Sequence, residues 1–376
     1  MSASNNKEKV YKVALSMMKG VTATFLRYLE EQNISAEDFF NWDKKELQGR
    51  LEKVNPDFLD SYRREEAMFS ARKELDNLER HNIRCFCYGD DDYPWRLEDI
   101  PDAPLTLYCL GEADLNMAHP VGIVGTRRCT GYGVDFTRKF TAELGGYFPD
   151  LGVISGLAFG IDAAAHTAAL ENGLTTVAVV AHGLNTIYPA AHRDLAKRII
   201  KEGGAIVSEY PFGTTPYRGR FLERNRIVAA LSDAVVVMES EIKGGAMSTA
   251  NTAFGYNREV FALPGRVSDP ISAGCNHLIS RNKAHLLSGA ADIIEQTGWQ
   301  PLGLNIQPGM RSLFPELQGD AKRIYDMLRF SHEPESLDNI HHTLRIPMPE
   351  LMGLLGELEF DGVVVKLPGN RYEVGS

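Results

Sequence analysis

The sequence predicts an α/β protein in which a Rossmann-like, doubly wound and mostly parallel sheet is flanked by a small N-terminal all-α domain and a C-terminal winged helix. Three observations predict this fold class. Amphipathic helical patterns fill residues 1–80, short apolar runs alternate with helical stretches in residues 81–300, and three helical patterns followed by a hairpin pattern occupy residues 316–376. A stretch with several prolines and glycines at 301–315 is the predicted linker.

The N-terminal domain is predicted to consist of short helices, because its helical pattern is interrupted at "KGVT" (residues 19–22) and at "NPD" (residues 55–57). After residue 80 the composition changes. Between Cys85 and Gly111 the chain is rich in proline, aromatic and acidic residues, which is typical of a short strand, several turns and a second strand. This segment leads into the main domain.

The main domain contains the strand signals "VGIVG", "GVISG", "TVAVVAHG", "AIVSEY", "AVVVMES" and "EVFALPG". Each run is short and continuously apolar, as expected of parallel strands that helices cover on both faces. The runs end in Gly, Ser, His, Glu or Pro, so polar groups are expected to gather at the carboxyl edge of the sheet, where open α/β sheets bind ligands.

The C-terminal domain is predicted to contain a helix at residues 321–330, helices over "SLDNIHHTL" and "PMPELMGLLGELEFDG", and a hairpin that turns at "PGN". A winged helix alone suggests a transcriptional regulator. Residues 301–376 carry 7 basic and 11 acidic side chains, however, which argues against binding of duplex DNA by this domain and favours a contact with protein.

The charge distribution is compatible with a basic surface formed by the middle of the chain, because most of the excess acidic charge lies elsewhere. The formal net charge is −10, but residues 116–300 carry 17 basic and 16 acidic side chains, and the basic ones occur in tight groups. The five cysteines lack the paired spacing of a zinc site, and no signal peptide or membrane-spanning run of about 20 apolar residues is visible. We therefore expect a cytoplasmic protein without a metal or cofactor.

The first candidate loop, "GTRR", follows the first parallel strand and precedes a helix. Backbone N–H groups freed by the glycine turn and by the helix N-terminus form an anion site, to which an arginine adds a bidentate phosphate donor. A tight turn with solvated arginines is an equally good interpretation of the pattern alone. The candidate residues are Gly125, Thr126, Arg127 and Arg128.

The second candidate loop, "SGLAFGIDAAAH", contributes Ser155, Gly156 and Gly160 at a strand end. Asp162 and His166 follow four residues apart on one helical face, which invites a catalytic interpretation. No serine or cysteine lies in a nucleophile elbow, and a helix-capping aspartate beside a hydrogen-bonded histidine is the commoner outcome.

The third candidate group is Arg224, Asn225 and Arg226, predicted to lie just ahead of a helix that leads into an apolar strand. This position brings two guanidinium groups close to the sheet edge. The arginines contact phosphate, or Glu223 and Glu239 hold them in ion pairs, and the two roles are compatible.

The fourth candidate loop, "EIKGGAMSTANTA", resembles a phosphate cradle. It supplies backbone donors, a point charge and hydroxyl groups through Lys243, Gly244, Gly245, Ser248 and Thr249. The spacing is not that of a Walker loop, so ATP hydrolysis is not indicated. Four anion-binding loops along one sheet edge indicate a polyanion, and an unstacked single strand is the expected ligand.

The chain resembles the DprA/Smf family of DNA-processing proteins over nearly its whole length. The motifs "YPWRLEDIPDAPLTLYCLG", "VGIVGTRRCTGYG", "SGLAFGIDAAAH", "GLNTIYPAAH", "SEYPFG", "FLERNRIVAALSDAVVVMES", "KGGAMSTANTAFGYNREVFALPG" and "GCNHLI" occur in the family's order. The resemblance implies a homodimeric protein that binds single-stranded DNA, protects incoming strands and loads the RecA recombinase during natural transformation. It implies a mediator and not an enzyme, with an N-terminal domain of sterile-alpha-motif or helix-hairpin-helix type.

The resemblance also implies roles for single residues. Arg127 matches the family's phosphate-binding arginine and Lys243 its DNA-contacting lysine, while Arg224 and Arg226 match the motif beside that groove. The chain departs from the family at Gly244, where serine is usual, and at Phe159, where arginine is usual.

The alternative function is a nucleotide-binding enzyme of the phosphoribohydrolase type, which has a related fold and a "PGGxGTxxE" loop. The corresponding stretch here, "KGGAMSTAN", lacks the terminal acid.

Overall fold

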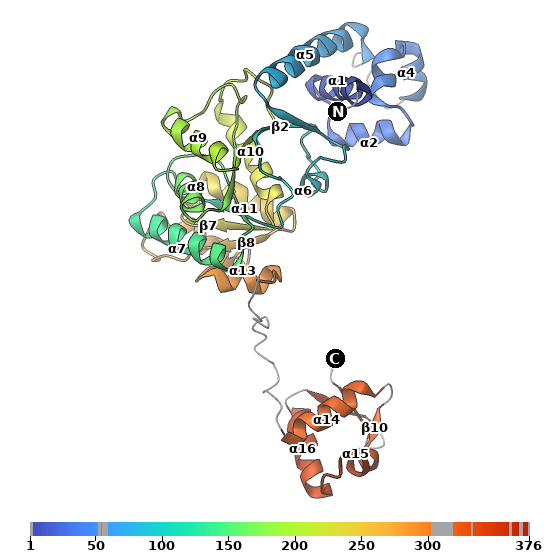
Figure 1. Cartoon of the computed structure of the whole chain (residues 1–376), viewed down its shortest axis with the longest axis vertical. Coiled ribbons are helices and arrows are strands. Elements are labelled where there is room, and N and C mark those ends of the chain that lie inside the picture. The colour runs from blue at the N-terminus through green and yellow to red at the C-terminus, as the bar shows by residue number, and fades with distance from the viewer. Residues whose placement is uncertain are drawn as a thin grey trace. The chain divides into compact units, whose positions relative to one another are not determined.

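The computed structural model describes residues 3–51, 54, 59–301, 319–331, 334–360, 363–367 and 371–374. The chain forms two compact units, residues 1–302 and 303–376 (Figure 1). The first unit joins the N-terminal helices to the sheet domain, and the second is the C-terminal domain. Within the described residues, none of the helices has the length and apolar character needed to cross a bilayer.

The second, third and fourth N-terminal helices are short, as predicted, and a side-chain cap begins each of them, whereas the first and fifth have 15 and 20 residues. Thr22, Ser35 and Asp43 accept hydrogen bonds from backbone N–H groups in the first turns of the second, third and fourth helices. The interruption predicted at residues 19–22 is confirmed, and the one at 55–57 lies outside the described residues. The helices are α1 (Ala3–Met17), α2 (Ala23–Glu31), α3 (Ala36–Asn41), α4 (Lys44–Arg50) and α5 (Ser61–Arg80).

The sheet of the first unit has nine strands in the order β1-β2-β6-β5-β4-β3-β7-β8-β9. All pairings from β6 to β9 are parallel, which confirms the predicted mostly parallel sheet. The two predicted strands of the lead-in segment, β1 and β2, join this sheet as an antiparallel edge, which the sequence did not indicate. The two-residue β9 was not predicted. The strands are β1 (Arg84–Cys87), β2 (Thr106–Gly111), β3 (His119–Val124), β4 (Leu151–Ser155), β5 (Thr175–Val179), β6 (Ala205–Ser208), β7 (Ala234–Val237), β8 (Glu259–Ala262) and β9 (His285–Leu286).

Helices cover both faces of this sheet, which explains why its strands are apolar without alternation. Val121 and Ile123 of β3 pack with residues of α7 and α8, whereas Val124 packs with residues of α10 and α11. The helices are α7 (Gly131–Tyr147), α8 (Ile161–Glu171), α9 (Arg193–Lys201), α10 (Arg218–Leu231), α11 (Gly245–Gly255), α12 (Ala273–Ser280) and α13 (Ala290–Thr297), with a 3₁₀ turn at Ala190–His192.

The strand order places a topological switch point between β3 and β7. The chain adds β4, β5 and β6 on one side of β3 and then returns to add β7 and β8 on the other side. The connections after β3 and β7 therefore leave the sheet in opposite directions. A crevice opens outside the carboxyl ends of these two strands, at the place where sheets of this type bind ligands.

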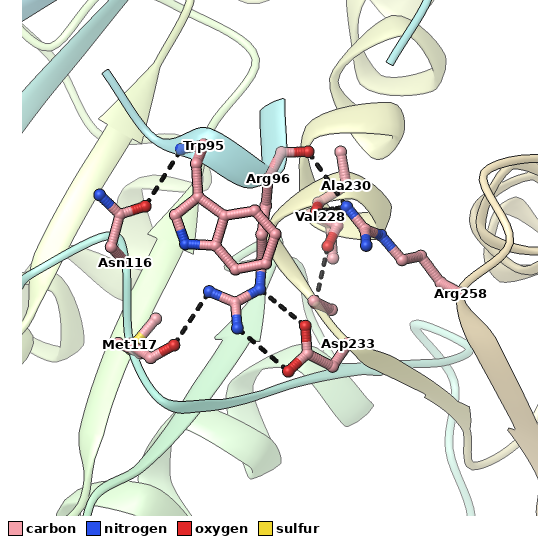
Figure 2. Close-up of polar contacts among 9 residues, drawn as sticks. Trp95, Arg96, Asn116, Met117, Val228, Ala230, Asp233 and Arg258 are labelled. Atoms are coloured by element: carbon pink, nitrogen blue, oxygen red, sulfur yellow. Dashed lines mark hydrogen bonds and ion pairs between the residues drawn. The ribbon is translucent and has the colours of Figure 1, made fainter. Parts of the chain in front are cut away.

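The segment that leads into the sheet is fastened by one buried arginine (Figure 2). Arg96 lies in the short helix α6 (Trp95–Glu98), is 4% exposed, and donates from Nε and Nη2 to Asp233, over 2.7 and 3.1 Å, just ahead of β7. Its Nη1 donates to the Met117 carbonyl over 2.9 Å. Arg258 donates to the carbonyl oxygens of Arg96 and Ala230, so the same cluster also holds the end of α10.

The C-terminal unit has the helices and strands of a winged helix, as predicted. Its core contains Ile324, Ile340, Leu351 and Val364. The predicted hairpin turn at 368–370 and most of the predicted linker at 301–315 lie outside the described residues. The elements are α14 (Gly319–Phe330), β10 (Glu335–Ser336), α15 (Leu337–Leu344), α16 (Met348–Phe360), β11 (Val364–Leu367) and β12 (Arg371–Val374).

Candidate nucleic-acid interface

A cleft of about 820 Å³ lies at the switch point, where the connections after β3 and β7 face the N-terminal half of α10. Three of the four candidate loops contribute ten of the predicted residues to its walls. They are Gly125, Thr126, Arg127, Arg128, Arg224, Asn225, Lys243, Gly244, Gly245 and Thr249. The other predicted residues, Ser155, Gly156, Gly160, Arg226 and Ser248, do not line the cleft.

The loop after β3 is held by its backbone, which leaves its arginine side chains free to face solvent. The Thr126 N–H donates to the Glu239 carbonyl over 2.7 Å, and the Glu239 carboxylate accepts from the N–H and the hydroxyl of Thr130 over 2.8 and 2.5 Å. Arg127 and Arg128 are exposed. The Arg127 guanidinium lies 5.6 Å from the centre of the Phe221 ring, so it is presented beside an aromatic face.

The loop after β7 supplies the second cation of the cleft. Lys243 is exposed, and α11 begins two residues later, at Gly245, with its free N–H groups at the cleft. Gly244 is closely surrounded. A Cβ atom there would lie 2.3 Å from the Ser240 Oγ and 3.0 Å from the Glu241 carbonyl oxygen, so a larger residue requires Ser240 to move.

The loop after β4 has a structural role. Ser155 donates its hydroxyl to the Ile123 carbonyl over 2.6 Å, and the Asp162 carboxylate accepts from the N–H groups of Gly156 and Ala158 over 3.1 and 3.3 Å. Gly160 has φ +79°, and a Cβ atom there would lie 2.3 Å from the Thr126 carbonyl oxygen. Gly160 therefore permits the loops after β3 and β4 to pack closely against each other.

His166 is part of the core, which agrees with the structural interpretation of the Asp162 and His166 pair. Its Nδ1 lies 2.7 Å from the Thr176 hydroxyl, which itself donates to the Val153 carbonyl over 2.8 Å. Nδ1 therefore carries the proton of the neutral ring. Burial lowers the pKa of His166 to about 3, so the ring stays neutral at physiological pH.

Arg224 is the buried cation behind the cleft. It is 4% exposed and donates from Nη1 to the Val179 carbonyl over 2.9 Å. Its guanidinium occupies the space where Gly156 lacks a side chain, because a Cβ atom at Gly156 would lie 1.7 Å from Nη1. Burial lowers the pKa of Arg224 and raises the pKa of the Asp162 carboxyl, while the attraction between the two groups opposes both shifts.

The ion pairs predicted for the third candidate group are wrong. Arg226 donates to Glu209 over 2.5 Å and lies 3.5 Å from a carboxylate oxygen of Asp102. Glu223 instead accepts from the Tyr210 hydroxyl, over 2.8 Å. Glu239, the other predicted partner, is bonded to the loop after β3. The prediction failed because these contacts join segments that are distant in the sequence.

The predicted position of this group relative to its helix is also wrong. Arg224, Asn225 and Arg226 lie within α10, which begins at Arg218, and not just ahead of it. The helical start was hard to place because the N-cap residue, Tyr217, has no side-chain capping bond.

The cleft also has an aromatic and apolar wall that sequence reasoning missed. Tyr217 is 68% exposed, Leu222 is 57% exposed and Tyr188 is 47% exposed, and all three line the cleft with Phe221 and Arg218. The stretch "PYRGRFLERNR" interleaves aromatic and basic residues. This pattern is typical of surfaces that bind single strands, and it was the available signal.

No group of three or more histidine, cysteine or carboxylate side chains among the described residues is arranged to hold a metal ion. The carboxylates at the cleft are Asp162, which is buried against backbone N–H groups, and Glu241, which is exposed. The arrangement combines exposed cations, helix N-terminal N–H groups and aromatic faces. Such a surface can bind phosphate groups and stack bases.

Comparisons with known proteins match both the sheet domain and the C-terminal unit. The family model described as DNA recombination-mediator protein A matches residues 84–298, and the model of the DprA winged helix domain matches residues 312–370. Protein Smf of a Synechocystis strain is 33% identical over 401 residues, which cover 98% of this chain and 99% of that protein. DNA processing protein DprA of Streptococcus pneumoniae is 40% identical over 211 residues, covering 56% of this chain and 73% of that protein.

Two solved structures are similar to the chain. The X-ray structure of DprA from Streptococcus pneumoniae matches with a TM-score of 0.63 and 33% identity, covering 76% of this chain and 96% of that one. A structure of DNA processing protein A from Helicobacter pylori, described by its single-stranded DNA binding mode, matches with a TM-score of 0.51 and 31% identity, covering 57% and 94%. The cleft, the sheet and the C-terminal unit thus have one explanation: the chain belongs to the DprA/Smf family of DNA recombination-mediator proteins.

Proposed function

We propose that this chain binds single-stranded DNA in the cleft at the switch point and acts there as a recombination mediator. As a homodimer in the cytoplasm, it protects incoming single strands and loads the RecA recombinase onto them during natural transformation. It catalyses no reaction on the DNA. The family to which the chain belongs, described as recombination mediators, supports this role.

The observation that carries the proposal is the placement of Arg127 and Lys243. Both side chains are exposed on the same cleft, although they come from loops after different strands. Neither forms an ion pair with any residue that the structure describes. Two unpaired cations on one concave surface attract a ligand with more than one phosphate group, and a nucleic-acid backbone satisfies this condition.

The aromatic wall favours a single strand over a duplex. Bases in a duplex are stacked on one another and leave no face for Tyr217 or Tyr188, whereas unpaired bases can stack on these exposed rings. Stacking depends little on base identity. We therefore expect affinity for oligonucleotides with weak sequence preference.

The nucleotide hydrolase, the alternative function, lacks a catalytic acid at the expected position. Asn251 stands there, and its side chain donates to the Met247 carbonyl over 2.8 Å and accepts from the Lys283 ammonium over 3.0 Å. Asn251 does not line the cleft. These contacts favour a binding role for the loop.

A salt titration tests the proposal. The affinity for a single-stranded oligonucleotide, measured by fluorescence anisotropy, should fall steeply with salt and exceed the affinities for duplex DNA and for a nucleoside monophosphate. Arg127→Ala and Lys243→Ala should each weaken binding and reduce the slope of log affinity against log salt by about one unit. The same variants should lose the ability to promote RecA filament assembly on the oligonucleotide.

Arg193→Ala is the matched control, because Arg193 is an exposed arginine that does not line the cleft. Its slope should equal that of the unmodified protein. Unchanged slopes in both cleft variants would refute the proposed site, and turnover of nucleoside monophosphates would support the hydrolase instead.

A further inference from the structure

The connection between β6 and α10 carries part of the cleft wall. Residues 209–217 leave the sheet after Ser208, and Pro216, Tyr217 and Arg218 line the cleft where α10 begins. Gly213, in the middle of this connection, has φ +88°, a conformation that few other residues adopt. Tyr217 ends this segment, which has no regular structure, so its position and the start of α10 at Arg218 depend on the contacts that hold the segment.

The middle of the connection is held by the N-terminal helices. The Phe212 N–H donates to the Glu74 carboxylate of α5 over 2.7 Å. Glu74 is only 4% exposed, and burial raises the pKa of its carboxyl. A buried carboxylate is costly unless it is hydrogen-bonded, so the bond from the Phe212 N–H stabilises the Glu74 side chain in this position.

The Phe212 side chain is held by the same helix and by His81, the residue that follows it. Its ring lies 4.5 Å from the His81 ring, measured between centres, and it packs against the hydrophobic cluster that contains Ala71 and Leu78 of α5. The backbone and the side chain of Phe212 are thus both attached to α5.

The other side of the connection is attached to the sheet domain. Asn185 accepts from the Gly213 N–H over 2.9 Å, and the Gly183 N–H donates to the Thr214 carbonyl over 2.9 Å. Gly183 itself permits this approach, because a Cβ atom there would lie 2.4 Å from the Pro211 carbonyl oxygen. Three residues after these contacts, the chain reaches Tyr217.

We propose that Glu74 is a positioning residue for the DNA-binding cleft, through which helix α5 holds the connection 209–217 and so orients Tyr217 and Arg218. Glu74 does not line the cleft. The proposal rests on the proposed function, because it assigns to the N-terminal helices a part in single-strand binding. In this role those helices support the cleft wall from behind, although the residues that line the cleft all lie between Val124 and Thr249.

Three variants test this role. Glu74→Ala removes the acceptor and should weaken binding of a single-stranded oligonucleotide about fivefold, the lower end of typical coupling between distant sites. Glu74→Gln keeps a carbonyl oxygen that accepts from the Phe212 N–H, so its affinity should stay within about twofold of the unmodified protein. Glu79→Ala, which removes an exposed carboxylate from the same helix, is the charge-matched control and should bind normally.

A double-mutant cycle separates positioning from general destabilisation. In the background Tyr217→Ala/Arg218→Ala, the wall that Glu74 positions is absent, so adding Glu74→Ala should change the affinity by less than about twofold. A loss of affinity that is the same in both backgrounds would overturn the proposal. So would normal affinity of Glu74→Ala in the otherwise unmodified protein.

His81→Ala provides the test if Glu74→Ala does not fold. His81 is exposed, so its replacement should leave folding intact while removing the ring that holds Phe212. A loss of affinity that disappears in the Tyr217→Ala/Arg218→Ala background supports the proposal, and normal affinity overturns it. The two hypotheses fail separately: if the unmodified protein does not bind single strands, the proposed function fails, whereas normal binding by these variants refutes only the role of α5.

Discussion

Phe159 is an exposed aromatic residue that lies beside the cleft without lining it. It is 47% exposed, and its ring lies edge-on to His192 at 4.8 Å between centres. Its neighbour Ala158 lines the cleft, and Gly160 packs against the backbone of Thr126 and Arg127. The position is therefore close to the proposed phosphate contacts but supplies no charge.

Phe159→Arg should add one phosphate contact at this place. We expect tighter binding of a single-stranded oligonucleotide at low salt, and a salt slope that is steeper by about one unit, because one more counterion is released. The measurement is the same anisotropy titration. Phe254→Arg is the control, since Phe254 is equally exposed (50%) and lies near the other end of α11. Equal slopes in the two variants would mean that only net charge had changed.

At the scale of elements, the short helix α6 shows how a segment without a sheet partner is fixed to the sheet domain (Figure 2). Arg96 makes two bonds to Asp233 and a third to a carbonyl group, and its guanidinium lies 4.2 Å from the centre of the Trp95 ring. The planar guanidinium satisfies all of these partners at once, which lysine could not do.

Arg96→Ala should lower the free energy of unfolding of the first unit by about 3 kcal/mol, because it leaves the Asp233 carboxylate without its partner in a largely buried place. All three tryptophans, Trp42, Trp95 and Trp299, belong to residues 1–302, so urea unfolding followed by tryptophan fluorescence reports on this unit. Arg193→Ala, an exposed substitution, should change the free energy by less than about 0.5 kcal/mol. Similar midpoints for the two variants would show that the cluster contributes little.

At the scale of the whole molecule, the cleft is complete within one compact unit. Every residue that lines it belongs to residues 1–302. The C-terminal unit has no comparable cationic surface on its third helix, since α16 carries Glu350, Glu357 and Glu359 and no basic residue. A contact of the winged helix with protein stays a prediction.

Removal of residues 303–376 should therefore leave single-strand binding almost intact. We expect the affinity of the shortened chain to stay within about twofold, with an unchanged salt slope, because no phosphate contact is lost. The isolated C-terminal unit should not bind duplex DNA in the same assay. A tenfold loss of affinity on shortening would show that the C-terminal unit shares in DNA binding.

The parts of the fold that were predictable are those encoded by local patterns. The continuous apolar runs predicted all of the parallel strands from β3 to β8, because burial on both faces imposes this composition. The two residues of β9 carry no such pattern, and they are recognised as a strand only because they pair with β8 in the folded sheet.

The candidate site was predictable where the residues that line the cleft come directly after a strand. Arg127 and Lys243 were found because strand ends and glycine turns mark them in the sequence. The partners of Arg226 and the roles of Gly156 and Glu74 depend on contacts between distant segments, which no local pattern contains.

The fit of the Arg224 guanidinium against Gly156 has an evolutionary consequence. The two residues belong to different motifs, yet Gly156 cannot be exchanged freely while Arg224 remains, because a methyl group at 156 would overlap the Arg224 side chain. A lineage that replaces the glycine first must pass through a sterically strained ancestor. Descendants are therefore expected to inherit both residues together or to have lost the arginine before the glycine.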